Sequence, residues 1–168
     1  VSMSLRTSHM STTGDLPDVS GLSDTQLIIS YYTRLGSGSL VASVGTNLPS
    51  GKTELTNDEF LSAVLISQRA YNFRVPSLGQ GFGASPSLTW AMPVGDNMSI
   101  GVGASYQFRG AYKPFSIRDE EYTPGDEVLV TGGVNFRLDP QSGISLDVSH
   151  SIYAADQFDG AEIYQSGS

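Results

Sequence analysis

One segment, residues 98–109, alternates apolar and small polar residues without interruption, and this pattern constrains the fold more than any other feature. Its apolar positions are Met98, Ile100, Val102, Ala104, Tyr106 and Phe108, and its other positions are Ser99, Gly101, Gly103, Ser105, Gln107 and Arg109. Side chains alternate faces along a β-strand, so the segment is predicted to be a strand with two different faces. A face in bulk water usually carries Lys, Glu and Thr, whereas Ser and Gly suit the inner wall of a pore. The pattern therefore favours a transmembrane β-barrel.

The composition agrees with this interpretation and excludes several other classes. Charged residues make up 15% of the 168 residues, against roughly 25% in an average soluble protein. No run approaches the ~20 apolar residues that a membrane-spanning helix needs, which excludes a helical membrane protein. The net charge of −8 argues against nucleic acid as a partner, because nucleic-acid binding requires a basic surface. The chain has no cysteine, and therefore no disulfide framework, thiolate metal site or cysteine nucleophile.

Six further segments show the same two-residue period, which gives seven predicted strands in total. They cover residues 1–10, 26–35, 40–48, 87–94, 128–137 and 144–152. Most are about ten residues long, which is the length that a tilted strand needs to cross a bilayer. The fold class is thus predicted to be all-β, an antiparallel up-and-down transmembrane barrel within a single unit over residues 1–168.

The small, polar side of each segment is predicted to face the lumen, and the apolar side is predicted to face lipid. The larger polar residues on the lumen side are Arg6, Gln26, Arg34, Asn47, Gln107, Arg109, Asn135, Arg137 and Asp147. The lipid side is represented by Leu27, Ile29, Val44, Leu88, Trp90, Ile100, Val102, Val130, Val134, Leu146 and Val148. Two apolar residues, Ile28 and Tyr32, depart from the pattern because they fall on the polar side.

Short and long connections alternate along the chain, and this regularity is independent of the strand pattern. Residues 35–38, 94–97 and 138–143 consist of turn-forming residues and predict tight turns. The long connections are residues 11–23, 50–83, 110–125 and 155–168. Outer-membrane barrels have short periplasmic turns and long extracellular loops, so these four segments are predicted to be extracellular loops.

Most acidic residues lie in the predicted loops, where they are expected to keep the loops soluble. They are Asp15, Asp18, Glu54, Asp58, Glu59, Asp119, Glu120, Glu121, Asp156, Asp159 and Glu162. Asp147 is the one acid expected deep within a strand. A divalent-cation bridge from the loop acids to anionic lipid headgroups is an alternative, although the sequence shows no defined ligand spacing.

The longest loop contains a signal for a short helix. Thr56 is followed three residues later by Glu59, which forms a capping box and predicts a helix over residues 57–69. The run Val64-Leu65-Ile66 could equally be extended. A helix at this position could fold inward and narrow a pore, or it could pack on the rim as a lid without a transport role.

Two glycine-containing segments resemble phosphate-binding loops only superficially. Gly45 and Gly51, which precedes Lys52-Thr53, are separated by five residues where the phosphate-binding motif requires four, and Pro49 intervenes. A strand end that runs into a loop is the preferred interpretation. The run Gly79-Gln-Gly-Phe-Gly83 is likewise expected to begin a strand with close backbone passage.

Catalysis finds no support in the sequence. The two histidines, His9 and His150, are expected on the apolar face near the loop ends of their strands, in the headgroup layer. Ser149 is adjacent to His150 but points to the opposite face, so the pair cannot act as nucleophile and base. Two histidines without a suitable carboxylate spacing also make a zinc site unsupported. We therefore expect no enzymatic activity, no metal and no cofactor.

Arginines and aromatic residues are each open to two interpretations. The four arginines on the predicted lumen side would favour anions as pore residues, but pairing with neighbouring strands or loop acids is preferred for any single one. Aromatic residues that lie near strand ends are candidates for interfacial belts, the alternative being the core of a β-sandwich. These aromatics are Tyr31, Trp90, Tyr106, Phe108, Phe136 and Tyr153, with Trp90 nearer a strand centre.

The segments Ser39–Lys52 (SLVASVGTNLPSGK) and Pro86–Pro93 (PSLTWAMP) resemble strands of bacterial outer-membrane, porin-like barrels. The resemblance is to the broad group that contains long-chain fatty acid transporters and barrels linked to phenol-degradation operons. It implies passage of small solutes, apolar ones among them, across the outer membrane, with outer-membrane lipid as a second partner. The chain departs from this group because seven strands is an odd number and because Ser166-Gly-Ser168 is not an aromatic terminal strand. Both departures predict that the chain is roughly half of a larger barrel.

Three competing functions remain at this stage. The chain could be a non-conducting outer-membrane anchor or adhesin whose long acidic loops bind an external partner. It could also be a soluble β-sandwich whose serines and glycines face water. An outer-membrane hydrolase is the least favoured of the three, because the sequence shows no catalytic triad.

Overall fold

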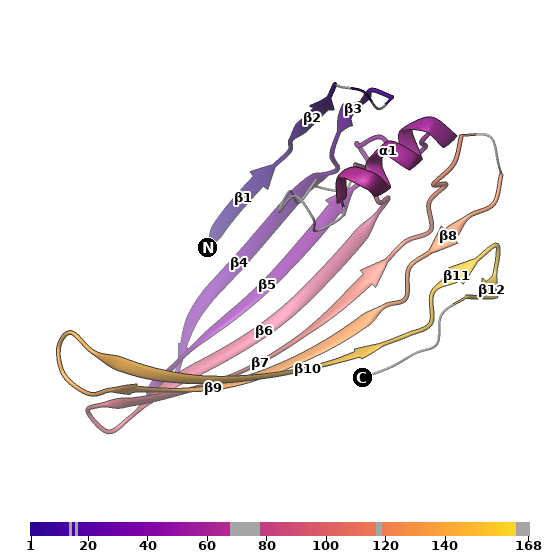
Figure 1. Cartoon of the computed structure of the whole chain (residues 1–168). Coiled ribbons are helices and arrows are strands. Elements are labelled where there is room, and N and C mark those ends of the chain that lie inside the picture. Colours follow the sequence, from indigo (N-terminus) through magenta and orange to yellow (C-terminus); the bar gives the residue numbers. More distant parts are fainter. Residues whose placement is uncertain (14, 16, 68–77, 117–118, 164–168) are drawn as a thin grey trace.

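The main element of the structure, a computed structural model, is one antiparallel sheet of seven strands (Figure 1). The structure describes residues 1–13, 15, 17–67, 78–116 and 119–163. In spatial order the strands are β1 (Ser2–Arg6), β4 (Thr25–Leu35), β5 (Gly38–Leu48), β6 (Gly83–Val94), β7 (Met98–Arg109), β9 (Glu127–Arg137) and β10 (Gly143–Tyr153). Neighbouring strands are antiparallel, and they follow one another along the chain when the short strands in the loops are left out. The predicted seven-stranded, up-and-down, all-β architecture is confirmed.

The three predicted tight turns join neighbouring strands at one end of this sheet. Leu35 pairs with Gly38 across a two-residue turn, in which Gly36 has a φ of +62°. Gly95, in the turn after β6, has a φ of +66°. Glycine adopts this left-handed backbone without steric cost, which explains its use at both turns.

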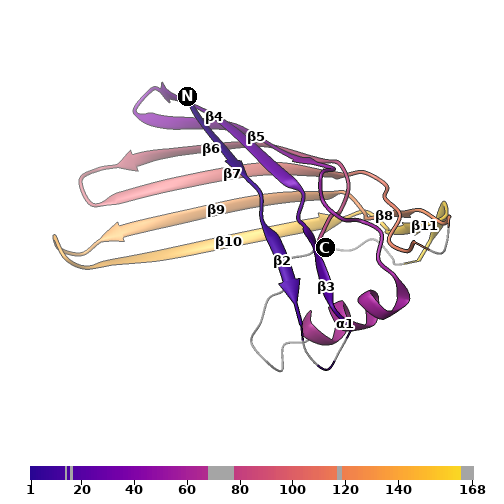
Figure 2. The same ribbon diagram turned by 90° about the horizontal axis from the view of Figure 1, so that it is seen from above.

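The opposite end of the sheet carries the long connections, and these contain elements of their own. A hairpin of β2 (His9–Thr12) and β3 (Val19–Leu22) forms a two-stranded sheet. The helix α1 (Asn57–Ser67) follows β5, and a three-stranded sheet is formed by β8 (Tyr122–Thr123), β11 (Gln157–Phe158) and β12 (Ala161–Glu162). Figure 2 shows the β2–β3 hairpin, α1 and the β8–β11 region together at this end of the long strands.

Two details of the sequence interpretation require correction at the N-terminal end. Residues 1–10 were predicted as one strand, but the chain breaks at residues 7–8 and continues as β2 in a separate sheet. The predicted loop 11–23 in turn contains β3. Arg6 pairs with Gln26 but His9 pairs with Leu22, so the register shifts by one residue at the break. Ser23 N donates to Ser8 O over 2.8 Å and Ser23 Oγ accepts a hydrogen bond from Ser8 N over 3.0 Å, which continues the β2–β3 pairing up to the break.

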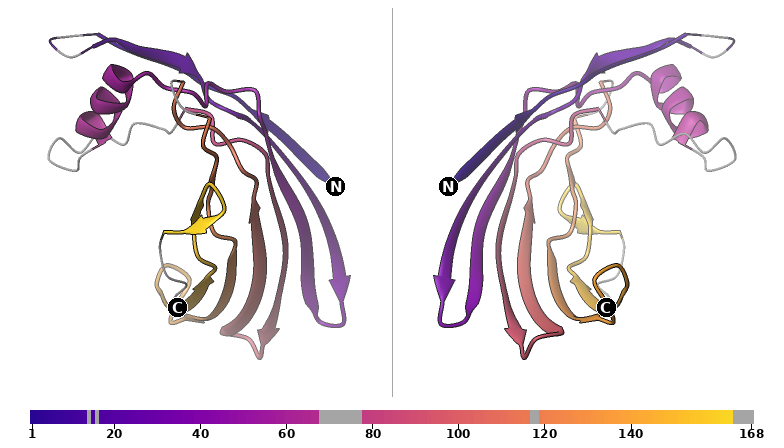
Figure 3. Two further views of the ribbon diagram at one scale, coloured as in Figure 1. Left: turned by 90° about the vertical axis from the view of Figure 1, so that its right-hand side faces the viewer. Right: turned by 90° about the vertical axis from the view of Figure 1, so that its left-hand side faces the viewer.

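The seven strands curve into a trough. Figure 3 shows this curvature from the right-hand side and from the left-hand side of Figure 1. This curvature follows from the right-handed twist that neighbouring strands accumulate across a sheet. In the order of strands, β1 and β10 are the two edges, so the described residues form an open sheet.

In the part of the chain that the structure describes, no second layer of secondary structure packs against the apolar face of the trough. Among the described residues, the only buried hydrophobic side chains are Val19 and Leu78, and both lie in the loop region. A β-sandwich would bury an apolar face of each sheet against the other. The sandwich interpretation is therefore wrong for the described chain.

Candidate functional site

The register of the sheet places every predicted lumen residue on the same face. Directly paired residues of antiparallel strands share a face, and residues two apart along a strand do so as well. Gln26 pairs with Asn47, Gly83 with Arg109, and Ser99 with Asn135. By the same pairing rule, the predicted set Arg6, Gln26, Arg34, Asn47, Gln107, Arg109, Asn135, Arg137 and Asp147 shares one face, which we call the polar face.

The residues that were predicted to contact lipid lie together on the opposite, apolar face. Val44 pairs with Ile29, Ile100 with Val134, and Leu146 with Val134. Seven of these eleven residues are exposed, among them Val102 at 58% and Leu146 at 67%, and the other four are partly exposed. The register thus separates the two predicted sets completely. What fills the space beside each face stays a prediction.

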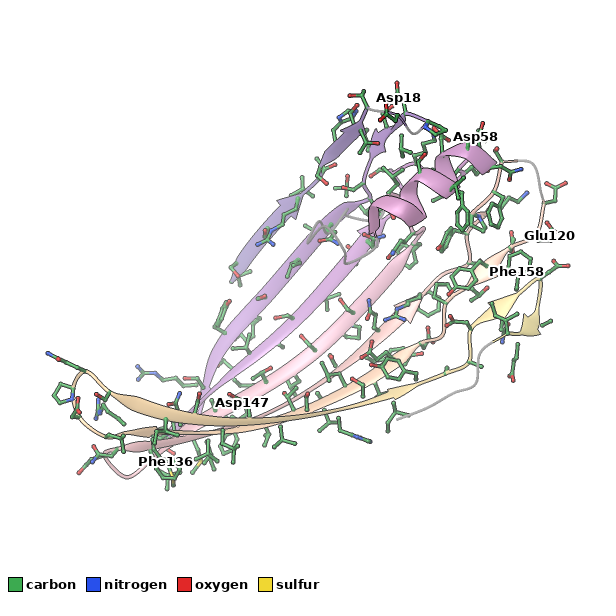
Figure 4. The ribbon with its side chains drawn as sticks, in the orientation of Figure 1. Asp18, Asp58, Glu120, Phe136, Asp147 and Phe158 are labelled. Atoms are coloured by element: carbon green, nitrogen blue, oxygen red, sulfur yellow. The ribbon has the colours of Figure 1, made fainter. Side chains whose placement is uncertain are left out.

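The polar face lies on the concave side of the trough. Figure 4 shows Phe136, an apolar-face residue, pointing from the convex side, whereas Asp147 lies on the inner side. A concave wall of small and polar residues, with an apolar convex wall, is the arrangement that encloses an aqueous passage in a membrane.

Small residues on the polar face leave room that neighbouring polar side chains occupy. Ser85 Oγ lies 2.6 Å from the position that a Cβ on Gly45 would take. Gly103 is flanked in the same way by the hydroxyl oxygens of Thr131 and Thr89, at 2.8 and 3.1 Å. The glycines thus keep the wall thin, and hydroxyl groups line it.

The concave side deepens into a cavity of about 360 Å³ at its loop end. Hydroxyl and amide side chains make up much of the wall, together with Ile28, the predicted exception on the polar side, and Phe82. Ligand-sized pockets in proteins have volumes of roughly 300–1,000 Å³. The cavity can therefore hold one small organic molecule.

Arg109 lies in this cavity wall and is held by protein groups. Its Nη2 is 3.0 Å from Glu127 Oε2 and 3.0 Å from Gln107 Oε1, and its Nη1 donates to Gly125 O over 3.1 Å. At the turn end, Arg137 Nη2 donates to Asp96 O over 2.7 Å. The preferred interpretation of the arginines, pairing with the protein, is therefore confirmed for these two.

Asp24, which the sequence pattern does not single out, is the most connected acid in this region. Its side chain is 6% exposed. Its Oδ2 accepts hydrogen bonds from Asn47 Nδ2 over 2.7 Å and from Gln80 N over 2.6 Å, and its Oδ1 accepts one from Gly51 N over 2.8 Å. Asp24 thereby fastens the start of β4 to the end of β5 and to the segment before β6. Its place between two strand patterns is the only sequence signal that could have identified it.

Several loop acids also make contacts within the loops, in addition to the expected role in solubility. Asp156 accepts hydrogen bonds from the Tyr122 hydroxyl and from Gly125 N, each over 2.6 Å. The Tyr122 bond and then the Gly125 bond lower the pKa of Asp156. Asp119 pairs with Lys113 over 3.0 Å.

The predicted capping box is present at the start of α1. Glu59 N donates to Thr56 Oγ1 over 3.3 Å, and Thr56 N donates to Glu59 Oε2 over 3.1 Å. Glu59 also pairs with Lys52, and this hydrogen bond is the main cause of its lowered pKa. The predicted helical end at residues 68–69 lies outside the described residues.

Two contacts attach α1 to other loops at this end of the sheet. The Phe60 ring meets the Phe115 ring edge-on at 5.0 Å, which connects the helix to the loop after β7. The helix also lies against β3. These contacts place α1 on the rim of the trough, where it joins three loops to one another.

The sequence and fold were compared with known proteins. No protein-family model matches the chain, and no curated protein matches it. Among solved structures, it is similar to the crystal structure of an outer membrane channel from Pseudomonas putida F1, with a TM-score of 0.61 and 14% sequence identity. The alignment covers 95% of this chain and 56% of the channel. At this identity the likeness shows a shared fold, and the chain spans little more than half the length of the channel.

The segments that resembled phosphate-binding loops are part of the rim. Strand β5 ends at Leu48, and the donors that follow it are used internally, since Gly51 N bonds to Asp24 and Lys52 Nζ to Glu59. Gly83 begins β6, and a Cβ on Gly79 would lie 2.8 Å from the backbone of Gly51. A strand end that runs into a loop, and glycines with close backbone passage, are both confirmed.

The described residues contain neither a metal-binding cluster nor a membrane-spanning helix. Within those residues, no group of three or more His, Asp or Glu side chains is arranged to hold a metal ion. No helix in the same residues is long and apolar enough to cross a membrane. Ser149 and His150 point to opposite faces, because Ser149 pairs with Thr131 and His150 with Val130.

Proposed function

We propose that this chain forms part of the wall of an outer-membrane channel through which small solutes cross. The observation that carries the proposal is the difference between the two faces of one curved sheet. Each of the six long strands has mostly small and polar residues on the concave side and exposed apolar residues on the convex side. The larger apolar or aromatic residues on the concave side are Ile28, Tyr32, Val41, Leu129 and Tyr153.

The dimensions of the sheet support a membrane location. Strands β4 to β10 of the main sheet are 11 or 12 residues long, and a tilted strand of about 9–11 residues spans a bilayer. The apolar face extends across all seven strands and is exposed, whereas a soluble monomer rarely exposes an apolar patch of more than a few hundred Å². Hydrocarbon is the environment that removes this face from water at the least cost.

The shape of the concave side supports a passage rather than a filled barrel. The cavity at the loop end is open to the trough, and its wall carries neutral amides and hydroxyls. The similarity of the fold to a channel agrees with this assignment. We propose that the solutes are small organic molecules and that outer-membrane lipid is the second partner.

Two measurements test the proposal. The protein should partition with membranes and require detergent for extraction, and liposomes that contain it should swell in small neutral solutes and conduct ions. A protein that is monomeric without detergent would contradict the membrane location. A membrane-inserted protein without flux or conductance would favour the non-conducting anchor or adhesin instead.

A further inference from the structure

Two cavities adjoin at the loop end of the concave face, and three side chains line both of them. The inner cavity, of about 360 Å³, lies over β5, β6 and β7, and the outer cavity, of about 740 Å³, lies beside β1 and the β3–β4 junction. Gln26, Asn47 and Gln80 belong to the walls of both. All three side chains are carboxamides, so we call them the amide partition.

Asp24 fixes the amide partition to the sheet. It binds the side chain of Asn47 and the backbone N of Gln80, and it is itself buried. Asn47 Nδ2 also donates to Gly81 O over 2.8 Å, which brings the segment before β6 against β5. Gln26 stands on β4, directly opposite Asn47 in the register. The partition is thus built from two strands and one anchored loop.

The ionised groups around the partition are bound by other protein groups, with one exception. The Asp24 carboxylate accepts three hydrogen bonds, and the Arg109 guanidinium on the inner side is paired with Glu127. Arg6 borders the outer cavity alone. Gln26 and Gln80 are exposed to the cavities, and a carboxamide offers both donors and an acceptor without charge.

We propose that the amide partition is the selectivity element of the passage, and that it favours uncharged, hydroxyl-bearing solutes over charged solutes of equal size. This inference rests on the proposed channel function and names its solute class. A solute hydroxyl can exchange hydrogen bonds with the carboxamides as it moves from one cavity to the other. An ion loses part of its hydration at this point, and the three carboxamides offer no opposite charge to replace it; Arg6 borders the outer cavity only.

A matched set of three sugars tests the proposal in liposomes that contain the protein. Galactose, galacturonate and galactosamine have similar size and carry no charge, a negative charge and a positive charge. The wild-type protein is expected to admit galactose faster than either charged sugar. Gln26→Glu keeps the shape of the side chain and adds one negative charge, so the ratio of galactosamine to galacturonate flux should rise about tenfold.

Asn135→Asp is the control for charge in general. Asn135 lies on the same polar face but borders neither of the two cavities, and its substitution adds the same charge with the same shape. It is expected to change the flux ratio by much less than Gln26→Glu. An equal change in both variants, or no change in Gln26→Glu, would overturn the proposal. Charged sugars passing the wild type as fast as galactose would do so as well.

Asp24→Asn tests whether the partition depends on its anchor. In this variant an NH2 group replaces one of the two carboxylate oxygens, so at least one of the three N–H donors loses its acceptor. The segment at Gln80 should then loosen, and the selectivity for galactose should fall. Retained selectivity would contradict the role assigned to Asp24. Absence of flux for all three sugars in a correctly inserted wild type would contradict the channel function itself, and this outcome is distinct from flux that is insensitive to Gln26.

Discussion

The hydroxyl of Tyr122 donates a hydrogen bond to Asp156 Oδ2 over 2.6 Å and so joins β8 to the segment that precedes β11. Gly125 N donates to the other oxygen of the same carboxylate over 2.6 Å. These two bonds, the first the stronger cause, lower the pKa of Asp156. The small sheet on the rim therefore depends on an ionised carboxylate.

The first prediction follows from this lowered pKa. A carboxylate with a lower pKa in the folded state stabilises the fold above its unfolded pKa, and the contribution is lost as the pH falls through the folded value. The protection of the β8 and β11 amides from hydrogen exchange should therefore decline as the pH falls below the ordinary pKa range of a carboxyl group. Asp156→Asn should reduce this protection at neutral pH and remove its acid dependence, as measured by hydrogen exchange corrected for intrinsic rates. Asp18→Asn, at an exposed position, should change neither.

The second prediction concerns the close backbone passage at Gly51. A Cβ at this position would lie 2.6 Å from Asp24 N and 2.7 Å from Ser23 C, and neither backbone atom can move independently. Gly51→Ala should cost about 1–3 kcal/mol of stability, as overpacking typically does, and should weaken the bond from Gly51 N to Asp24. Urea unfolding in detergent micelles measures the loss.

Gly132→Ala is the matched control for this substitution. The nearest atom to its Cβ would be Gly101 O at 3.9 Å, so the methyl group fits without displacement. Equal destabilisation by the two variants would show that the contact at Gly51 is not the cause.

The sheet could be predicted from the sequence because two-residue alternation is a local property that each strand displays by itself. Residues 98–109 show it in full, and the structure has β7 at the same bounds. The tight turns were equally visible, since glycine at a left-handed position is a local requirement. The face of each residue follows directly from these two features.

The rim could not be predicted in the same way, because its contacts join residues that are far apart in sequence. Asp24 and Gln80 are 56 residues apart, and Tyr122 and Asp156 are 34 residues apart. An acid in a polar loop has the same sequence signature whether it serves solubility or accepts three hydrogen bonds. The break between β1 and β2 was missed for a related reason, since it is a change of register relative to residues 22–26, which are distant in sequence.

The third prediction concerns the start of α1. Thr56 Oγ1 accepts a hydrogen bond from Glu59 N, and the Glu59 side chain returns one from Thr56 N. Thr56→Ala should therefore destabilise the helix by about 1 kcal/mol. Hydrogen exchange within residues 57–62 should accelerate in proportion, while exchange in β5 stays unchanged. Thr13→Ala, an exposed threonine outside the strands and the helix, serves as the control, and acceleration by that variant would contradict the capping role.

The fourth prediction tests the membrane assignment of the two faces with adjacent residues of one strand. Val130 is 48% exposed on the apolar face, and Thr131 is exposed on the polar face, where it pairs with Gly103 and Ser149. If hydrocarbon contacts the apolar face, Val130→Lys should cost about 2–4 kcal/mol in lipid, because a charged side chain loses its hydration there. Thr131→Lys should cost far less, since its ammonium group stays in the aqueous passage. Urea titration in liposomes of defined thickness gives both free energies. An inverted arrangement would make Val130→Lys the milder of the two substitutions, and a soluble arrangement would make the two costs similar. Either result would refute the assignment of the faces.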